Sequence, residues 1–481
     1  MRRCRILAVV AAVAVVWGAG ALAAGARAAR AAAPATGSWG TAIEVPGLGA
    51  LNTAGNAEVL SVSCGSAGNC AAGGDYSGRH TEAFVADERD GVWGTAIEVP
   101  GMGALNTAGD AGVTSVSCGS AGNCAAGGTY WSEHPFGYHG FVAVERHGVW
   151  GTAIEVPGLA ALNTGAGAEV LSVSCASAGN CAAGGDYTGR QGGSHGFVAD
   201  ERNGRWGRAI QVPGPAAPGK GLNSQVNSVS CASAGNCAAG GYYSDQGFVA
   251  VERNGLWRTA IAVPGLAALN TGGDAQVSSV SCASAASCAA GGYYTGRHRR
   301  QQGFLAVERN GRWGTATGVP GLAALNTGAA AEVRSVSCGS AGNCAAGGYY
   351  ASGIIPPWRN YHGFVAVERN GRWGTATEMP GPAGLNSGED ATVMSVSCGS
   401  AGSCAADGLY GNRYQRFVAS EDHGVWDPAI EVPGLAALNK GTGARYRDGI
   451  SMSCAPAGPC AVGGNYFDAS GNMQGFVTQG G

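Results

Sequence analysis

The cysteines of this chain are spaced for a specific chemistry. Sixteen of the 17 cysteines form eight pairs in which five residues separate the two partners. Regular, even-numbered pairing in an exported chain predicts disulfides, whereas zinc sites favour two to four intervening residues and a second ligand pair. We therefore predict eight disulfides and no metal site. The predicted bonds are Cys64–Cys70, Cys118–Cys124, Cys175–Cys181, Cys231–Cys237, Cys282–Cys288, Cys338–Cys344, Cys398–Cys404 and Cys454–Cys460.

Tyrosine and asparagine recur in step with the cysteines. A tyrosine stands six residues after the second cysteine of every pair: Tyr76, Tyr130, Tyr187, Tyr243, Tyr294, Tyr350, Tyr410 and Tyr466. An asparagine follows leucine in every loop before the next pair: Asn52, Asn106, Asn163, Asn223, Asn270, Asn326, Asn386 and Asn439. Aromatic stacking with amide hydrogen bonds could hold sugars. The alternative is structural, with tyrosine closing each unit and asparagine bonding the loop backbone. Presence in all eight units favours the structural interpretation.

Residues outside the repeat are better candidates for ligand specificity. Trp131 and Trp358 lie in two long loops, 131–139 and 351–362, and the other unrepeated aromatic candidates are Tyr138, Tyr361, Tyr414 and Tyr446. Arginines lie in these or neighbouring loops, at Arg297, Arg299, Arg300, Arg359, Arg413 and Arg416. They indicate either an anionic ligand, such as a cell-wall polymer, or ordinary solvated loops.

The acids and histidines do not form a catalytic set. His139, His195 and His362 occupy a position that holds glutamine in other units, so it needs a polar residue rather than a metal ligand. Asp407 replaces a repeated glycine, and a single carboxylate is not a glycosidase pair. We expect no cofactor. A repeated glutamate near one turn is expected to be exposed and to keep a sheet edge soluble: Glu88, Glu145, Glu201, Glu252, Glu308, Glu368 and Glu421.

The elements that position these residues repeat every 51 to 60 residues. Each unit predicts four antiparallel strands, in the first unit at 58–64, 70–76, 84–89 and 93–100. Asn-Gly, Asp-Gly or His-Gly separates the third strand from the fourth, and Asn-Gly and Asp-Gly favour two-residue hairpin turns. No segment has a helical period. Eight such units predict an all-β fold, an eight-bladed β-propeller with four strands per blade.

The two ends of the chain complete one another. A lone fourth strand at 39–45 precedes the first unit, and a lone third strand at 476–479 ends the chain. We therefore expect these segments to pair and to close the ring.

The repeat resembles the Asp-box (BNR-like) propeller repeats of secreted sialidases and related proteins. The resemblance lies in an inner Ser-Val-Ser strand, a Gly-rich second strand and a hairpin carrying Gly-x-Trp, such as Gly204-Arg205-Trp206. It covers all eight units. The Asp-box aspartate position usually holds arginine here, as at Arg202, and aspartate only at Asp422, so the resemblance implies the fold and not the activity.

The N-terminal segment predicts export. A charged start, an apolar run from Ile6 to about Ala24 and a small-residue exit predict a signal peptide at 1–33, followed by one domain at 34–481. The alternative is an uncleaved anchor, because the apolar run is nearly long enough to span a bilayer. A net charge of −3 gives no general attraction to nucleic acid or, after cleavage, to membranes.

These observations predict a secreted, bacterial, monomeric binding protein without catalytic activity. We expect multivalent binding of a glycan or cell-envelope polymer through the face that carries the variable loops. The alternative is an extracellular protein-interaction scaffold that uses one long loop. A glycoside hydrolase is less favoured because no nucleophile and base can be placed.

Overall fold

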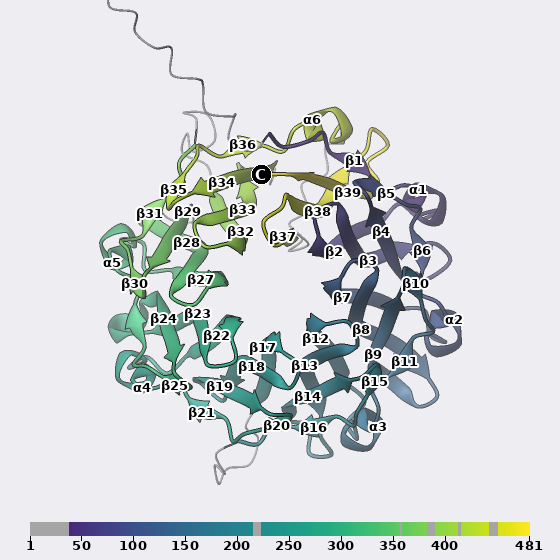
Figure 1. Cartoon of the computed structure of the whole chain (residues 1–481), viewed down its shortest axis with the longest axis horizontal. Helices are drawn as coiled ribbons and strands as arrows, with labels where there is room; N and C mark the ends of the chain where they lie inside the picture. The colour runs from purple at the N-terminus through teal and green to yellow at the C-terminus, as the bar shows by residue number, and fades with distance from the viewer. Residues whose placement is uncertain (1–37, 215–222, 356–357, 382–389, 412–414, 442–450) are drawn as a thin grey trace, which may run out of the picture. The chain divides into compact units, whose positions relative to one another are not determined.

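The computed structural model describes residues 38–214, 223–355, 358–381, 390–411, 415–441 and 451–481. The predicted signal peptide lies outside these residues and stays a prediction. The described chain forms eight antiparallel sheets that follow one another around a ring (Figure 1). The innermost strand of each sheet packs beside that of the next. The protein is therefore an eight-bladed β-propeller, as the sequence predicted. None of the described helices is long and apolar enough to cross a membrane.

Blades 1 to 7 each contain three long strands and a short outer one, and blade 8 differs in having a short innermost strand as well. The innermost strands are β2 (Ala57–Ser66), β7 (Ala111–Ser120), β12 (Ala168–Ser177), β17 (Ser224–Ser233), β22 (Ala275–Ser284), β27 (Ala331–Ser340), β32 (Ala391–Ser400) and β37 (Ser451–Cys454). The second strands are β3 (Asn69–Ser77), β8 (Asn123–Glu133), β13 (Asn180–Thr188), β18 (Asn236–Tyr243), β23 (Ser287–Thr295), β28 (Asn343–Ile355), β33 (Ser403–Tyr410) and β38 (Cys460–Phe467). The third strands are β4 (Thr81–Arg89), β9 (Phe136–Arg146), β14 (Ser194–Arg202), β19 (Gln246–Arg253), β24 (Gln301–Arg309), β29 (Trp358–Arg369), β34 (Gln415–Asp422) and β39 (Met473–Gly480).

The outer strand is interrupted, which the sequence analysis did not predict. In blades 1 to 7 it consists of two dipeptides that both pair with the third strand. Between them the chain turns aside, and the amide of Ala96, for example, donates to the Pro46 carbonyl of the preceding blade at 2.7 Å. The dipeptides are β5 (Val92–Trp93) and β6 (Ile97–Glu98), β10 (Val149–Trp150) and β11 (Ile154–Glu155), β15 (Arg205–Trp206) and β16 (Ile210–Gln211), β20 (Leu256–Trp257) and β21 (Ile261–Ala262), β25 (Arg312–Trp313) and β26 (Thr317–Gly318), β30 (Arg372–Trp373) and β31 (Thr377–Glu378), and β35 (Val425–Trp426) and β36 (Ile430–Glu431).

The structure also contains short helical turns that were not predicted from the sequence. One turn of helix stands in six of the described loops that lead from an outer strand to the next blade, at α1 (Leu48–Leu51), α2 (Met102–Leu105), α3 (Leu159–Leu162), α4 (Leu266–Leu269), α5 (Leu322–Leu325) and α6 (Leu435–Leu438). A glycine with positive φ precedes each turn, and its first side chain, such as Leu48, is fully buried. Four residues are too few for a helical period to show in the sequence. A separate 3₁₀ turn, η1 (Arg297–Arg299), lies in a loop of blade 5.

The eight predicted disulfides all form. In each blade the two cysteines lie directly opposite one another on the first and second strands, with Cα atoms 3.8–4.0 Å apart. Each bond therefore joins the two inner strands beside their connecting turn.

Serine hydroxyls join neighbouring blades. The first strand of a blade is a sheet edge, so its outward backbone N–H groups lack ladder partners. In blade 2 the amides of Val116 and Cys118 donate at 2.9 Å to the hydroxyls of Ser61 and Ser63 in blade 1. The same pair of bonds recurs from blade to blade and reaches across the ring closure, where Cys64 N donates to Ser453 Oγ. Paired serines thus satisfy the inner edges of blades 1 to 7, and in blade 8 the amide of Cys454 donates to Ser397 Oγ at 2.9 Å.

The repeated Gly-Gly of the second strand lets blades approach closely. A Cβ added at Gly127 would lie 2.6 Å from Val170 Cγ1 and 2.7 Å from Val173 Cγ2 of the next blade. Because such contacts are too short for real Cβ atoms, Val170 and Val173 can pack this closely only against a glycine.

The predicted ring closure is confirmed. The strand β1 (Ile43–Glu44) pairs antiparallel with β39, with Ile43 opposite Val477 and Glu44 opposite Phe476. The amides of Gly40 and Val45 extend this pairing by donating to the carbonyls of Gln479 and Gly475. Figure 1 shows the purple β1 beside the yellow β39. The first described segment therefore supplies the outer strand of the last blade.

The repeated glutamates are buried, so the prediction that they solubilise an exposed edge was wrong. Each side chain is no more than 3% exposed, because it turns into the interface with the preceding blade. There an arginine from the end of the preceding blade's third strand reaches it, as Arg202 Nη2 reaches Glu252 Oε1 at 2.6 Å. The pairs are Arg89–Glu145, Arg146–Glu201, Arg202–Glu252, Arg253–Glu308, Arg309–Glu368 and Arg369–Glu421. Burial still raises the pKa of these carboxyls, which the arginines partly counteract.

Removing one inner serine should weaken the contact between two blades. We expect Ser115→Ala to lower the free energy of unfolding by about 1–2 kcal/mol, because it leaves the buried Val173 amide without its acceptor. Denaturant unfolding of the oxidised protein measures the change. Ser284→Ala, at an exposed position, is the control. Equal stability of the two variants would contradict the structural role of the hydroxyl.

Glu88 is the one repeated glutamate with no ion pair or hydrogen bond among the described residues. Burial raises its pKa from 4.5 to about 6, so the folded protein binds the proton more tightly and loses stability as the pH rises through this interval. Replacing Glu88 with glutamine should therefore stabilise the protein at pH 8 by about 1–2 kcal/mol. The gain should vanish at pH 4. Thermal unfolding at both pH values tests this, and a loss of stability at pH 8 would contradict it.

Candidate functional site

The two faces of the ring carry different connections. On one face, the turns between third and fourth strands meet those between first and second strands, as where Gly91 N donates to Gly68 O. On the other face, loops that link blades meet the hairpins between second and third strands, as where Ala54 N donates to Ser77 O. We call these the turn face and the loop face. The loop face carries the variable segments.

The repeated tyrosines are held inside the blades at the loop face. Six of the eight are buried, and Tyr243 and Tyr294 are partly buried. In several blades the hydroxyl bonds a glutamate of the outer strand: Tyr350 donates to Glu378 Oε2 at 2.9 Å and Tyr466 to Glu44 Oε2 at 2.8 Å. These contacts support the structural interpretation, and a binding role for the tyrosines stays a prediction.

The repeated asparagines hold loop backbone. In the loop into blade 2, Asn106 Nδ2 donates to Thr81 O at 3.0 Å and Asn106 Oδ1 accepts from Asp110 N at 2.8 Å. Asn52, Asn163, Asn270 and Asn326 make the same two contacts in their own loops. Asn223 and Asn439 accept a backbone N–H at Oδ1, and Asn386 lies outside the described residues. The amides are therefore used within the fold.

The unrepeated aromatic residues of blade 2 form a cluster. Strands β8 and β9 extend beyond their counterparts in most blades, and their hairpin carries Trp131, Phe136 and Tyr138. The Trp131 ring lies edge-on to Phe136 at 5.0 Å and to Tyr138 at 4.3 Å between centroids. Phe136 is 67% exposed and Tyr138 37% exposed. This aromatic cluster offers an open apolar surface on the loop face.

A hollow of about 410 Å³ lies beside the cluster, between blades 2 and 3. Its polar lining is Asp110, Thr129, Tyr138, Glu169, Asp186 and Thr188. Tyr138 belongs to both features, and its hydroxyl donates to Asp110 Oδ2 at 2.6 Å. This hydrogen bond raises the pKa of Tyr138 to about 12. The aromatic cluster and the acidic hollow therefore form one continuous site, which we call the blade 2–3 site.

The carboxyl groups of Glu169 and Asp186 are neighbours in the hollow. Burial, and then the charge of Asp186, raises the pKa of Glu169 to about 7. Gln225 of blade 4 donates to Asp186 Oδ1 at 2.8 Å, and the hydroxyl of Ser194 also donates to Asp186. Near neutral pH the pair can therefore offer a ligand hydroxyl both a hydrogen-bond donor and an acceptor. The hollow has no arginine, lysine or histidine among its described lining residues, so its charge disfavours anionic ligands.

Asp110, Glu169 and Asp186 were not among the site residues predicted from the sequence. A signal was present in the position before each repeated tyrosine, which holds Asp75, Thr129, Asp186, Tyr242, Tyr293, Tyr349, Leu409 and Asn465. The opposite position in the first strand varies too, with Glu58, Gly112, Glu169 and Gln225 in the first four blades. Variation at two facing positions inside a constant motif marks where the blades differ in chemistry.

The candidate arginines do not gather at one place. Arg416 was expected in a loop, but it lies in β34 and is 4% exposed, with its Nε donating to Asn465 O at 3.1 Å. It takes the place of a repeated glycine, as Asp407 does, and burial raises the pKa of Asp407 to about 8 although the charge of Arg416 opposes this. Arg297 and Arg299 lie exposed in η1, and Arg300 donates to Thr327 O. Arg413, Tyr414 and Tyr446, and the side chains of Trp358 and Arg359, lie outside what the structure describes.

The histidines of the loop face bond to protein groups. His139 Nδ1 lies 3.2 Å from Glu155 Oε1, and its ring stacks on Tyr130. His362 repeats both contacts, with Glu378 and Tyr350. Within the described ranges, no three histidine, cysteine, aspartate or glutamate side chains could hold a metal together.

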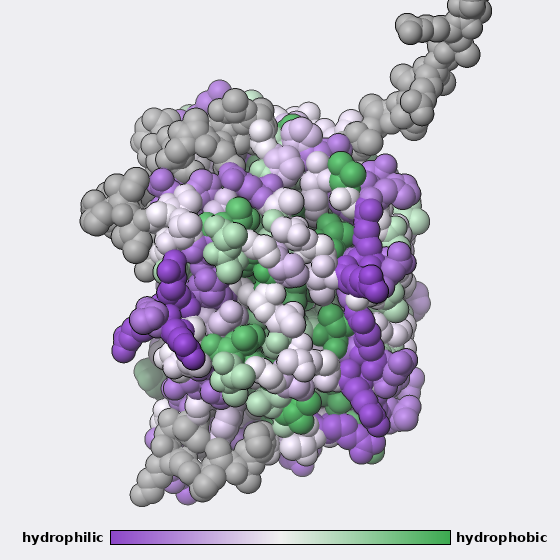
Figure 2. Space-filling model, turned by 90° about the vertical axis from the view of Figure 1, so that its left-hand side faces the viewer, coloured by the Kyte–Doolittle hydropathy of each residue, from purple (hydrophilic) through white to green (hydrophobic). Residues whose placement is uncertain are grey.

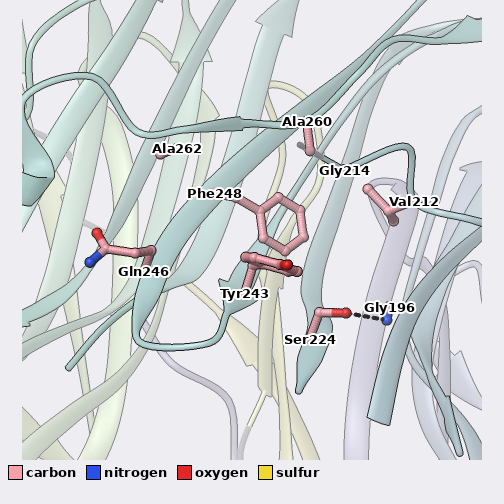
Figure 3. A pocket seen from close by; sticks show the side chains of 9 residues that line it. All are labelled: Gly196, Val212, Gly214, Ser224, Tyr243, Gln246, Phe248, Ala260 and Ala262. Carbon is pink, nitrogen blue, oxygen red and sulfur yellow. Dashed lines mark hydrogen bonds between the residues drawn. The ribbon is translucent and has the colours of Figure 1, made fainter. Parts of the chain in front are cut away.

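A smaller hollow lies between blades 3 and 4. It is mainly apolar, and Figure 3 shows Phe248 beside Tyr243 and the bond from Gly196 N to Ser224 Oγ. Its volume of about 40 Å³ suits a water molecule rather than a sugar ring. It is therefore a weaker candidate for ligand binding than the blade 2–3 site.

The fold and its closure make this chain a β-propeller protein. No protein-family model matches it, and no curated protein matches it in sequence. Among solved structures it is similar to Sqt1 of Chaetomium thermophilum bound to the N-terminus of a ribosomal protein, at 10% identity and a TM-score of 0.47 over 88% of this chain and 96% of that one. It is also similar to the β-propeller domain of the Trilobed protease from Pyrococcus furiosus, at 8% identity and a TM-score of 0.41 over 78% of this chain and 95% of that one. A third likeness is to an α-L-arabinanase of Penicillium chrysogenum complexed with arabinobiose, at 10% identity and a TM-score of 0.34 over 62% and 89%. None of these likenesses bears on the activity of this chain.

Replacing Asp186 with asparagine should lower the pKa of Glu169 from about 7 toward 4.5, because it removes the charge of Asp186, the largest cause of the shift after burial. NMR titration of ¹³C-labelled glutamate carboxyls measures this. Asp245→Asn, an exposed acid in blade 4, is the control. An unchanged Glu169 in the Asp186 variant would show that burial alone sets its pKa.

Proposed function

We propose that this protein is a secreted, non-catalytic binding protein and that the blade 2–3 site binds a glycan. The observation that supports the proposal is the continuity of an exposed aromatic cluster with a polar hollow of sugar-ring size. Aromatic rings stack on the apolar faces of sugars, while carboxylates, Thr129 and Thr188 can bond sugar hydroxyls. The eight disulfides are consistent with an extracellular location.

The charge of the site narrows the glycan class. Asp110, Asp186 and Glu169 line the hollow without a basic side chain among its described residues. A neutral or amino-bearing polysaccharide therefore fits better than an anionic envelope polymer. We therefore propose a neutral or amino-bearing glycan as the ligand, in place of the anionic ligand that the loop arginines had suggested.

The geometry of the carboxyl pair supports binding rather than hydrolysis. Glu169 and Asp186 lie directly opposite one another on β12 and β13, close enough that, in addition to burial, the charge of Asp186 raises the pKa of Glu169. Glycosidase carboxyl pairs stand about 5–5.5 Å apart in retaining enzymes and about 6.5–9.5 Å apart in inverting enzymes. Two carboxyls that face one another on paired strands instead present a single polar group to a bound hydroxyl.

The binding is also proposed to be centred on one site. The repeated tyrosines and asparagines are largely engaged within the fold, whereas the cluster of Trp131, Phe136 and Tyr138 belongs to blade 2 alone. We therefore expect about one glycan bound per ring, in place of the multivalent binding expected from the repeat.

Calorimetry with neutral, amino-bearing and anionic oligosaccharides tests the proposal. We expect Phe136→Ala and Asp110→Asn each to weaken binding about tenfold, equal to roughly 1.4 kcal/mol. Val425→Ala is the control, because this side chain is equally exposed but lies on the outer strand of blade 7. The proposal would be contradicted if a bound glycan had the same affinity for both site variants as for the unchanged protein. Turnover of a chromogenic glycoside would also contradict it.

A further inference from the structure

The turn face carries a guanidinium contact that recurs at six blade interfaces. At each, an arginine at the end of a third strand reaches the buried glutamate of the next blade. In several, the same guanidinium also donates to the carbonyl of the glycine in the next blade's hairpin turn, as Arg309 does to Gly371 O. All but Arg253 keep about half of their side-chain surface exposed. At six interfaces, therefore, a buried glutamate is contacted by an arginine that also faces the solvent.

The interface between blades 8 and 1 contains the same acceptor. Glu88 occupies the glutamate position and Gly91 the glycine position. The Glu88 side chain is 2% exposed, and neither carboxyl oxygen has a hydrogen-bond partner among the described residues. Among the described residues, the Gly91 carbonyl accepts one side-chain hydrogen bond, from Gln479 Nε2 at 3.3 Å.

The donor position of this interface holds glycine. Cys460 lies opposite Gly480, as Cys181 lies opposite Glu201 in blade 3. The residue that corresponds to Arg202 is therefore Gly481, which has no side chain to reach Glu88. The interface between blades 7 and 8 differs, because it has Asp422 at the arginine position and Gly480 at the glutamate position. Blade 1 alone thus presents the buried acceptor without its arginine.

We propose that Glu88 and the Gly91 carbonyl bind an arginine side chain of a partner polypeptide. Arginine fits because its planar fork can bond a carboxylate and a carbonyl at once, and because it stays charged when partly buried. The partner's guanidinium takes the place of the Gln479 amide on Gly91 O and neutralises Glu88. This site lies on the turn face, opposite the blade 2–3 site, so it does not depend on glycan binding.

Nα-acetyl-L-arginine amide is the first probe, and its citrulline counterpart is a control of the same shape without the charge. We expect the arginine probe, at concentrations up to about 50 mM, to raise the melting temperature of the oxidised protein at pH 8 relative to the citrulline probe. Glu88→Gln should abolish the difference, and Glu133→Gln, at an exposed position, should preserve it. No difference between the probes, or a difference that survives in Glu88→Gln, would overturn the proposal.

Gly481→Arg provides an independent test, because it restores the missing side chain within the protein. We expect it to raise the melting temperature by about 1–2 °C and to remove the response to the arginine probe. In a Glu88→Gln background the same change should give no increase. A Gly481→Arg protein that keeps the full probe response would show that the probe binds elsewhere and would refute the site.

Discussion

The unpaired edge of the innermost strand is the constraint on which this propeller depends. Eight sheets that meet around an axis place eight edge strands side by side, and their backbone N–H groups would be buried without acceptors. The two serines of each Ser-Val-Ser accept those groups from the next blade at about 2.9–3.2 Å. The hydroxyl is short enough to bridge neighbouring strands only if the blades approach closely. The repeated glycines of the second strand allow that approach, as Gly127 does against Val170 and Val173.

Further from the axis, the gaps widen and the contacts change in kind. Tryptophans such as Trp150 fill the outer wedge, and its Nε1 donates to Asp87 of the preceding blade at 2.9 Å. On the turn face, arginine crosses the same gap to a buried glutamate. A buried carboxylate is costly unless paired, so each Arg–Glu contact ties the register of one blade to that of the next. Gly481 occupies the arginine position next to blade 1, so the burial of the Glu88 carboxylate is not offset by an ion pair with any residue that the structure describes.

The distinctive chemistry lies where blades depart from the repeat. The hairpin of β8 and β9 carries the aromatic cluster, and two strand positions that face each other supply Glu169 and Asp186 in blade 3. These residues stand on regular strands, so the scaffold holds them in place. In blade 7, by contrast, Asp407 and Arg416 replace glycines and are buried, so a departure from the repeat can also serve packing.

The sequence alone determined the architecture. The cysteine spacing, the strand-turn pattern and the matching half-blades at 39–45 and 476–479 predicted eight disulfides, eight blades and the closing strand, because each depends on local spacing. The one-turn helices were not predicted because four residues show no helical period. The interruption of the outer strand was not predicted because it arises from a contact with the neighbouring blade. The burial of Glu88 and its counterparts escaped for the same reason, since a glutamate at a strand end is exposed in an isolated hairpin and enclosed only when a second blade packs on it. The tertiary structure alone joined Asp110, Tyr138, Glu169 and Asp186 into one site, because residues from separate blades become neighbours only when the ring assembles.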